Sequence, residues 1–355
     1  MSVKKILSDA ASIIKLFIIL ILFSINSKAE ENNIKHYSKD MGILSLMYHR
    51  FNEPKYPSTN IQMDIFKNQI QIIKEKNYVF YNPGEFNFQF NEPKKIKKIL
   101  ITIDDGFSSF YENAWPYLKE NKIPFLLFIS TEAVGNFGYM TWDQIKEIES
   151  EEFAYIGNHS HTHGYLVEFS EQDFLNDIQK SINIFKKKLG YSPQFFSYPF
   201  GEYSLFIKKY IEKNFESAFG QHSGVIDLSK DRYELPRFAI NEKYGDLERF
   251  KFIINLNPFP FKNLYPEDKH ILAKSNPPDT IIEFFEDQKN IENINCFSDE
   301  GNKWMKSNVQ FINSKKIKIN FRDKFLFRRG KINCSLNDFG KWRWFGFQLS
   351  IDEFK

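Results

Sequence analysis

Two adjacent carboxylates and a pair of histidines have the types and spacing for chemistry. Asp104 and Asp105 directly follow the apolar run 99–103, and His159 and His163 lie four residues apart after another apolar run. Two histidines and one carboxylate form a common open site for zinc or a similar divalent ion. Such an ion polarises a carbonyl and lowers the pKa of bound water, while a second carboxylate takes the proton from that water. The set therefore favours metal-assisted hydrolysis, although each motif alone also fits an ordinary turn or polar loop.

The spacing of the histidines predicts which of them act together. At positions i and i+4, His159 and His163 are expected to point to one side of a helical turn, and His161 is expected to point elsewhere.

Two further motifs also follow apolar runs. His49 ends the run Leu46-Met47-Tyr48-His49, and a lone histidine there is more often structural than catalytic. The other motif is Tyr198-Pro199-Phe200-Gly201, which by itself fits a Pro-Gly turn. Its backbone N–H groups near Phe200 are candidates for binding an oxyanion.

The elements that must position these residues alternate between strands and helices. Apolar runs predict strands at 42–48, 99–103, 125–129, 153–156, 195–198, 217–219 and 238–240. Helical spacing and capping residues predict helices at 64–76, 110–121, 141–149, 170–189 and 205–214. This alternation predicts an α/β domain with a mostly parallel sheet or barrel. The carboxyl ends of such strands lie on one face, so we expect all four motifs to gather there.

The alternation stops near residue 260, where we place a domain boundary. Strand-like pieces at 317–321, 325–328 and 342–349 predict a small antiparallel β domain over 261–355. Its tryptophans, including Trp304 and Trp344, fit either core packing or stacking on sugar rings.

The compartment follows from the N-terminus. Lys4 and Lys5 precede the apolar run 16–25, and Ser27-Lys28-Ala29 resembles a cleavage site, so residues 1–29 are predicted to be a signal peptide. The alternative is an uncleaved membrane anchor; in either case the mature chain, about residues 30–355 with its α/β domain at 30–260, works outside the cytoplasm, in the periplasm or secreted. In that oxidising setting Cys296 and Cys334 form either a disulfide or two buried thiols.

The charge composition excludes one class of partner. The 355 residues contain 48 Lys and Arg against 45 Asp and Glu. A near-balance of this kind argues against a nucleic-acid partner, because such proteins usually carry a basic surplus or stripe.

The combination of motifs, in this order, resembles the polysaccharide deacetylases, which are the NodB-like carbohydrate esterases. The resemblance covers about residues 40–255 and includes Thr102-Ile103-Asp104-Asp105-Gly106, the two histidines and Tyr198-Pro199-Phe200-Gly201. It implies a distorted (β/α) barrel that removes N-acetyl groups from a polysaccharide with a divalent metal, Zn²⁺ being expected. By position, Asp104 would be the general base, and Asp105, His159 and His163 would bind the metal.

Two departures from the family pattern affect these assignments. The family's third motif usually starts with an arginine that braces the base, but Ser197 stands at this position. Arg237 is the candidate replacement, with a surface arginine as the alternative. The family's late L-x-x-H, whose histidine is the general acid, is matched only by the early Leu46-Met47-Tyr48-His49. Such placement is similar to the exported, circularly permuted poly-N-acetylglucosamine deacetylases, so His49 is the expected acid and His222 the second candidate.

Other functions remain consistent with these residues. One is a non-catalytic glycan-binding protein on the same scaffold, and another is a metal-dependent hydrolase of a small amide or ester. The sequence names neither the glycan nor the metal.

Overall fold

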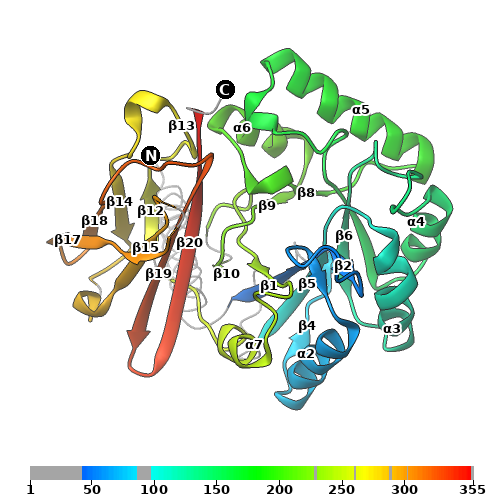
Figure 1. Ribbon diagram of the computed structural model, residues 1–355, viewed down its shortest axis with the longest axis horizontal. Coiled ribbons are helices and arrows are strands. Elements are labelled where there is room, and N and C mark those ends of the chain that lie inside the picture. Colours follow the sequence, from blue (N-terminus) through cyan, green and yellow to red (C-terminus); the bar gives the residue numbers. More distant parts are fainter. Residues whose placement is uncertain are drawn as a thin grey trace, which may run out of the picture.

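The computed structural model describes residues 42–85, 97–227, 230–259, 261–287, 290–301 and 303–352 (Figure 1). The predicted signal peptide lies outside these residues. Within them, no helix combines the length and apolar character needed to cross a membrane.

A curled, mostly parallel sheet forms the larger half of the molecule (Figure 1). Its strand order is β10-β1-β5-β6-β7-β8-β9, with β4 also paired to β5 and β11 to β1. The strands are β1 (Ile43–Tyr48), β4 (Val79–Phe80), β5 (Lys98–Ile103), β6 (Phe125–Ile129), β7 (Ala154–Asn158), β8 (Phe195–Ser197), β9 (Ser217–Phe219), β10 (Val225–Ile226) and β11 (Phe238–Ala239). Only β10 runs antiparallel to its neighbour within this described sheet. The curled sheet and its helices confirm the α/β domain that the alternation predicts and agree with the distorted (β/α) barrel that the resemblance implies.

Helices cover the outer face of this sheet (Figure 1). They are α2 (Met63–Glu75), α3 (Trp115–Glu120), α4 (Trp142–Glu149), α5 (Glu171–Leu189), α6 (Leu205–Asn214) and α7 (Leu247–Ile253). Ser170 caps α5 by accepting a hydrogen bond from the Asp173 N–H, and Gly190 ends it with φ of 88°.

The predicted helix at 110–121 differs in detail, because it begins as a π-helical segment at Phe110–Ala114. Pro116 has no N–H and cannot donate to the carbonyl four residues earlier. The N–H of Trp115 accordingly reaches back to Phe110 O.

Two smaller sheets follow in the C-terminal region, which Figure 1 shows in yellow to red beside β9 and β10. Their orders are β12-β14-β18-β17 and β13-β20-β19-β15-β16. The strands are β12 (Phe261–Tyr265), β13 (His270–Ile271), β14 (Thr280–Phe284), β15 (Asn295–Ser298), β16 (Met305–Lys306), β17 (Asn308–Asn313), β18 (Lys316–Asn320), β19 (Arg329–Asp338) and β20 (Lys341–Ile351). Apart from the parallel pair β13–β20, the described pairings are antiparallel. These sheets begin at Phe261, and the domain boundary at residue 260 stays a prediction.

The predicted strand at 325–328 is wrong, because β19 starts at Arg329. Phe325 is buried, and its N–H donates to the side chain of Asn276 rather than to a strand. An apolar run with aromatic residues is typical of a strand. Here, however, the backbone N–H of Phe325 bonds to the Asn276 side chain instead of to the backbone of a neighbouring strand.

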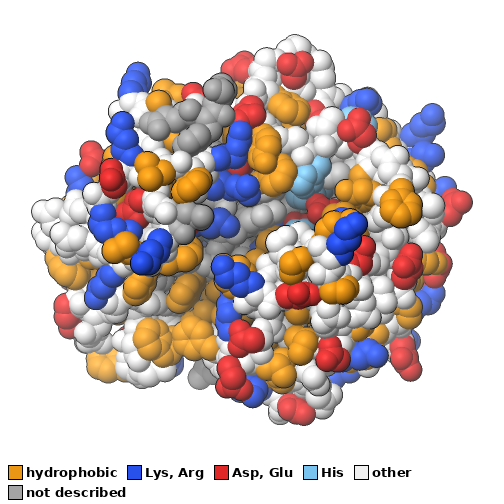
Figure 2. All heavy atoms as spheres, in the orientation of Figure 1, with side chains coloured by type: hydrophobic (Ala, Val, Ile, Leu, Met, Phe, Trp, Pro, Cys, Tyr) orange, Lys and Arg blue, Asp and Glu red, His pale blue; other side chains and the backbone are white. Residues whose placement is uncertain are grey.

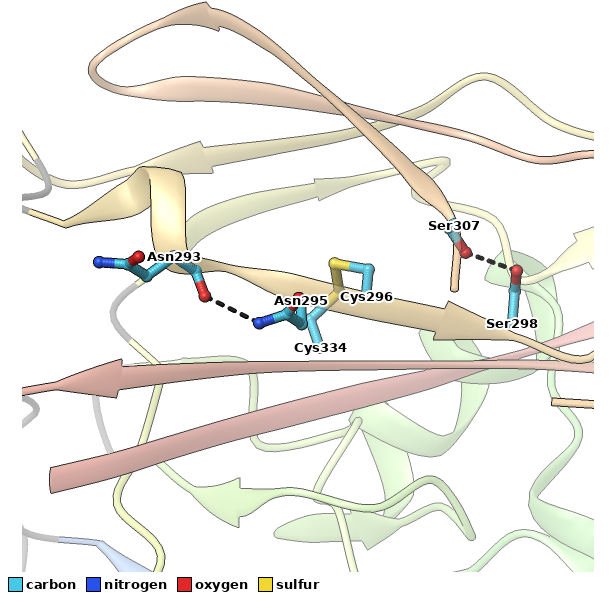
Figure 3. Close-up of a disulfide and its surroundings, with 6 residues drawn as sticks. All are labelled: Asn293, Asn295, Cys296, Ser298, Ser307 and Cys334. Atoms are coloured by element: carbon cyan, nitrogen blue, oxygen red, sulfur yellow. Dashed lines mark hydrogen bonds between the residues drawn. A yellow bond between two sulfur atoms is a disulfide. The ribbon is translucent and has the colours of Figure 1, made fainter. Parts of the chain in front are cut away.

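Cys296 of β15 and Cys334 of β19 face each other in register and are joined by a disulfide (Figure 3). Both side chains are fully buried in the core shared by the two C-terminal sheets. The bridge closes a separation of 38 residues.

Candidate metal and catalytic site

Four side chains meet at the carboxyl edge of the parallel sheet. Asp104 and Asp105 follow β5, and His159 follows β7. His163 Nε2 lies 3.1 Å from Asp105 Oδ1, and His159 Nε2 lies 3.3 Å from the same oxygen. One ligand atom from each of Asp105, His159 and His163 falls within 4.8 Å of the others. The geometry thus brings together the three residues predicted to bind a metal.

The two histidines converge through a loop and not through the helical turn expected from their spacing. Ser160 and His163 have φ of 67° and 54°, which fold the chain sharply back. The carboxylate of Asp177, on α5, accepts hydrogen bonds from the N–H groups of His161 and Thr162 at 2.8 and 3.0 Å. These bonds use up local donors that a helix would need and hold the turn in place.

His161 points away from the cluster, as the sequence predicts. Its Nδ1 forms a 2.9 Å hydrogen bond with Thr131 Oγ1, and its Nε2 lies 3.6 Å from Glu132. It is therefore a structural residue of the loop and a useful control for its neighbours.

The tautomer of His159 prepares it to bind a cation. Its Nδ1 lies 2.7 Å from the backbone oxygen of Ser197. A carbonyl only accepts, so Nδ1 carries the proton and the lone pair is on Nε2. Nε2 and Asp105 Oδ1 are both buried without a hydrogen bond. An imidazole lone pair and a carboxylate oxygen left unpaired beside a second imidazole fit a divalent ion of the zinc type.

Asp104 is held by an arginine from a distant part of the chain. Arg237 Nη1 and Nη2 donate to the two Asp104 carboxylate oxygens at 2.6 and 2.8 Å. Arg237 Nη2 also donates to Ser197 Oγ at 2.8 Å. Both charged side chains are fully buried, so Arg237 is not a surface residue. The arginine reaches past the small Ser197, which stands where the family pattern has its own arginine.

The two carboxylates are kept ionised by different partners. Burial raises the pKa of Asp104, but the charge and hydrogen bonds of Arg237, together with the charges of His159 and His49, outweigh this effect, and the net pKa lies below its usual value. Burial also raises the pKa of Asp105, but the neighbouring imidazoles of His159 and His163 and the charge of His49 hold that pKa well below the usual range. Asp105 sits at φ of 76°, a left-handed conformation that turns its side chain into the cluster.

The two candidates for a general acid have different surroundings. His49 follows β1, and burial lowers its pKa while the charges of Asp105 and Asp104 oppose that change. His222 is influenced by Glu234 and Lys269 instead, and burial lowers its pKa to about 4. The charges of Asp104 and Asp105 thus act on His49, whereas those of Glu234 and Lys269 act on His222.

The Tyr198-Pro199-Phe200 motif divides into a core residue and a site residue. Tyr198 is fully buried, and its hydroxyl donates to Tyr233 O at 3.2 Å. Phe200, at φ of 58°, stacks on Tyr165 with ring centroids 4.3 Å apart and meets His163 edge-on at 4.7 Å. Pro199 is the first residue of the short helical turn Pro199–Gly201, which contains Phe200. Phe200 therefore forms one wall of the cluster, and the Tyr198 side chain does not face it.

The C-terminal sheets also contact this wall. Gln348 Nε2, on β20, donates to Phe200 O at 2.9 Å, and the Arg329 guanidinium lies 5.4 Å from the Phe200 ring. Figure 2 shows histidine and acidic side chains on the barrel side of a hollow, with Lys and Arg side chains around it.

Sequence reasoning missed the supporting residues Asp177 and Gln348. Asp177 had a signal, because it lies on the buried face of the amphipathic helix α5, where an acid needs a partner. Gln348 had no such signal, because the residues near it in the sequence do not indicate a hydrogen bond to Phe200, 148 residues away.

Comparisons with known proteins agree with this geometry. Residues 91–214 match the family model described as polysaccharide deacetylase. The chain is 25% identical over 233 residues to the poly-beta-1,6-N-acetyl-D-glucosamine N-deacetylase of Staphylococcus aureus, covering 58% of this chain and 80% of that protein. It is 24% identical over 199 residues to a putative polysaccharide deacetylase of Bacillus subtilis, covering 55% of this chain and 70% of that protein.

Solved structures show the same fold. IcaB from Ammonifex degensii superposes with a TM-score of 0.56 at 24% identity, over 61% of this chain and 98% of that chain. The deacetylase PplD of Streptococcus pyogenes, in complex with acetate, superposes with a TM-score of 0.55 at 22% identity, over 61% of this chain and 99% of that chain.

Proposed function

We propose that this chain, which contains a polysaccharide deacetylase domain, is a metal-dependent hydrolase that removes N-acetyl groups from an extracytoplasmic polysaccharide. The observation that carries the proposal is the convergence of Asp105, His159 and His163 beside an arginine-bound Asp104. Poly-β-1,6-N-acetylglucosamine is the first substrate to test, because the Staphylococcus aureus relative is named for it. The periplasm or the cell exterior is the proposed location, supported by the N-terminal pattern of charged, apolar and small residues.

Asp105, His159 and His163 would hold the divalent ion, with Zn²⁺ the first candidate. The ion would supply a Lewis acid for the amide carbonyl and lower the pKa of water. Asp105 Oδ1 lies close to the Nε2 atoms of both histidines, so we assign Asp105 to metal binding. Asp104 is not assigned to metal binding, because its hydrogen-bond partners are Arg237 and Ser197.

Asp104 is the proposed general base, which accepts the proton of the attacking water. The bidentate contact with Arg237 fixes the plane of the carboxylate and keeps it ionised between turnovers. His49 is the proposed general acid, which donates a proton to the leaving amine. Backbone N–H groups of the Phe200 turn are proposed to stabilise the oxyanion, and the stacked Tyr165 ring supports that turn.

Acetate release tests the proposal directly. The substrates are poly-β-1,6-N-acetylglucosamine, chitin oligomers and peptidoglycan fragments, each offered to metal-loaded and chelated protein. Removing the base in Asp104→Asn, or the acid in His49→Ala, should lower the rate by about 10²- to 10⁴-fold. The matched control is His161→Gln, which changes the neighbouring histidine of the same loop and should keep most of the activity.

Each contrary result has a definite meaning. Acetate release that survives chelation, or that Asp104→Asn leaves intact, would show that the cluster is not the catalytic centre. Metal binding without acetate release from any glycan would favour a glycan-binding protein on this scaffold.

A further inference from the structure

One side chain of β20 connects the C-terminal sheets to the backbone beside the catalytic cluster. Gln348 Nε2 donates to Phe200 O at 2.9 Å, across a separation of 148 residues. Gln348 is 4% exposed, and its Oε1 is buried without a hydrogen bond from any described residue. Because a carbonyl only accepts, the amide must turn its N–H groups toward Phe200 and leave its oxygen unpaired. An unpaired buried oxygen costs stability, which indicates that this glutamine serves the contact with Phe200.

The turn that accepts this bond has an unusual backbone conformation. Phe200 has φ of 58° and ψ of 4°, and the following Gly201 has φ of 70°. A residue with a side chain seldom adopts this left-handed conformation, which persists only where the surrounding structure holds it. Within the turn, the Gly201 N–H donates to Tyr198 O at 2.9 Å. Gln348 adds a bond from outside the turn, at the carbonyl that joins Phe200 to Gly201.

One N–H group of this turn has no acceptor in the described part of the chain. Pro199 has no N–H, and the N–H groups of Gly201 and Glu202 donate to Tyr198 O and Pro199 O. Among the described residues, none accepts a hydrogen bond from the Phe200 N–H. This N–H is therefore the group of the turn that remains to stabilise the oxyanion of the proposed reaction.

Residues at the start of β19 contact the aromatic rings of the same turn. The Phe200 ring stacks on Tyr165 with centroids 4.3 Å apart and meets the His163 imidazole edge-on at 4.7 Å. The Arg328 guanidinium lies 4.0 Å from the Tyr165 ring, and that of Arg329 lies 5.4 Å from the Phe200 ring. The two C-terminal strands β19 and β20 thus hold both the rings and the backbone of this turn.

We infer that Gln348 is a positioning residue for the proposed reaction: from the C-terminal sheets, it fixes the Phe200 turn in the conformation that presents its N–H to the reacting carbonyl oxygen. The inference rests on the proposed function, because the turn has a catalytic task only if an amide is cleaved at this site. It gives the C-terminal sheets a part in the reaction, although Asp104, Asp105 and His163 all belong to the barrel.

Gln348→Met tests the inference, because methionine has a similar length but cannot donate to Phe200 O. The matched control is Ser350→Ala. Ser350 lies two residues further along β20, is 3% exposed, and forms a 2.9 Å hydrogen bond with His270 inside the C-terminal region. Each variant removes one buried side-chain hydrogen bond from the same strand, so a general loosening of the sheet would affect both alike.

Rates of the zinc-saturated protein give the first readout. The substrate is whichever of poly-β-1,6-N-acetylglucosamine, chitin oligomers and peptidoglycan fragments is deacetylated fastest. Gln348→Met should lower kcat roughly five- to thirtyfold and change KM by less than about twofold, because an oxyanion donor acts mainly in the transition state. Ser350→Ala should change kcat by less than about twofold. Equal losses of kcat in the two variants, or a loss confined to KM, would overturn the inference.

Amide exchange separates this inference from the proposed function, because it needs neither substrate nor metal. In chelated protein, NMR should show the Gly201 amide exchanging roughly three- to tenfold faster in Gln348→Met and less than about twofold faster in Ser350→Ala. Equal exchange in the two variants, or faster exchange with unchanged kcat, would overturn the inference. If exchange differs as expected but the unaltered protein releases no acetate, the proposed function fails while the hold of Gln348 on the turn stands.

A second variant covers the case in which Gln348→Met does not fold. Gln348→Asn keeps a buried amide but is one methylene shorter, so it should lose the bond to Phe200 and show the same pattern. Zn²⁺ affinity, measured by competition with a chelator, should change by less than about threefold, because Ser160 Oγ holds the His163 N–H separately at 3.0 Å. A fall in Zn²⁺ affinity that accounts for the loss of kcat would overturn the assignment to the turn.

Discussion

The parallel sheet and the C-terminal sheets use similar apolar residues in opposite ways. Every residue of β1 and β5 is buried, because helices and the barrel interior cover both faces. Along β18 and β19, buried and partly exposed residues alternate, because one face packs on the core and the other meets solvent.

This difference decides where chemistry is found. Lys98, the first residue of β5, is the only charged residue of β1 and β5, and Asp104, Asp105 and His159 follow the ends of β5 and β7, where rigid neighbours hold them. In the C-terminal sheets, charged residues lie along the strands and form exposed pairs such as Lys318–Asp279. Such a pair contributes about 1 kcal/mol or less, whereas a buried pair is costly to break.

The largest expected effect tests the buried pair of the barrel. Arg237→Met would leave Asp104 ionised, fully buried and without its counter-charge. We expect a loss of about 3–5 kcal/mol in the free energy of unfolding, measured by urea denaturation of the chelated protein.

The double variant Arg237→Met with Asp104→Asn is the control, because it removes both charges. It should recover much of the lost stability, which a double-mutant cycle would report as strong coupling. If Arg237→Met alone lowers the free energy of unfolding by less than about 1 kcal/mol, the buried pair contributes no more than an exposed pair does. The proposed difference between the two regions would then be wrong.

The next effect concerns the disulfide of the C-terminal sheets. Replacing both Cys296 and Cys334 by Ala should lower stability by about 2–4 kcal/mol, since the bridge restricts a loop of 38 residues in the unfolded chain. Hydrogen exchange should become faster in β15 and β19 and remain unchanged in β5. Equal acceleration in β5 would mean that the two regions unfold as a single unit.

The smallest effect lies at the contact between the two regions. Burial raises the pKa of Glu202 to about 7, although Arg329 Nε lies 3.3 Å away and opposes the shift. Since the folded pKa exceeds the ordinary value of 4.5, the folded state holds this proton more tightly than the unfolded state. The stabilisation is therefore complete below pH 4.5 and is lost as the pH rises through about 7.

Glu202→Gln keeps the neutral form at every pH. It should match the unaltered protein at pH 4.5 and be more stable by about 2 kcal/mol at pH 8.5, as measured by urea denaturation. The surface variant Glu248→Gln on α7 should change stability by less than about 0.5 kcal/mol at both pH values. A destabilised Glu202→Gln at pH 8.5 would show that the arginines, and not burial, dominate at this contact.

Prediction from sequence succeeded where the signal was local. The apolar runs at 99–103 and 125–129 became β5 and β6, and Ser170 and Gly190 bounded α5 as their capping chemistry requires. It failed where side chains replaced backbone partners, as in the loop of His159 to His163 and at Phe325. The strands β12 to β17 were not predicted, because short half-exposed strands carry weak periodicity.

By itself the sequence determined the fold class, the strand ends and the residue types that could bind a metal, because hydrophobic periodicity and turn chemistry act over a few neighbours. Only the tertiary structure decided that Arg237 would bind both carboxylate oxygens of Asp104 and that the Ser197 carbonyl would orient His159. It likewise joined Trp304 and Trp344 to α7 around one cavity. These contacts span tens to hundreds of residues, and their partners are set by the curl of the sheet and by the packing of the C-terminal sheets against it.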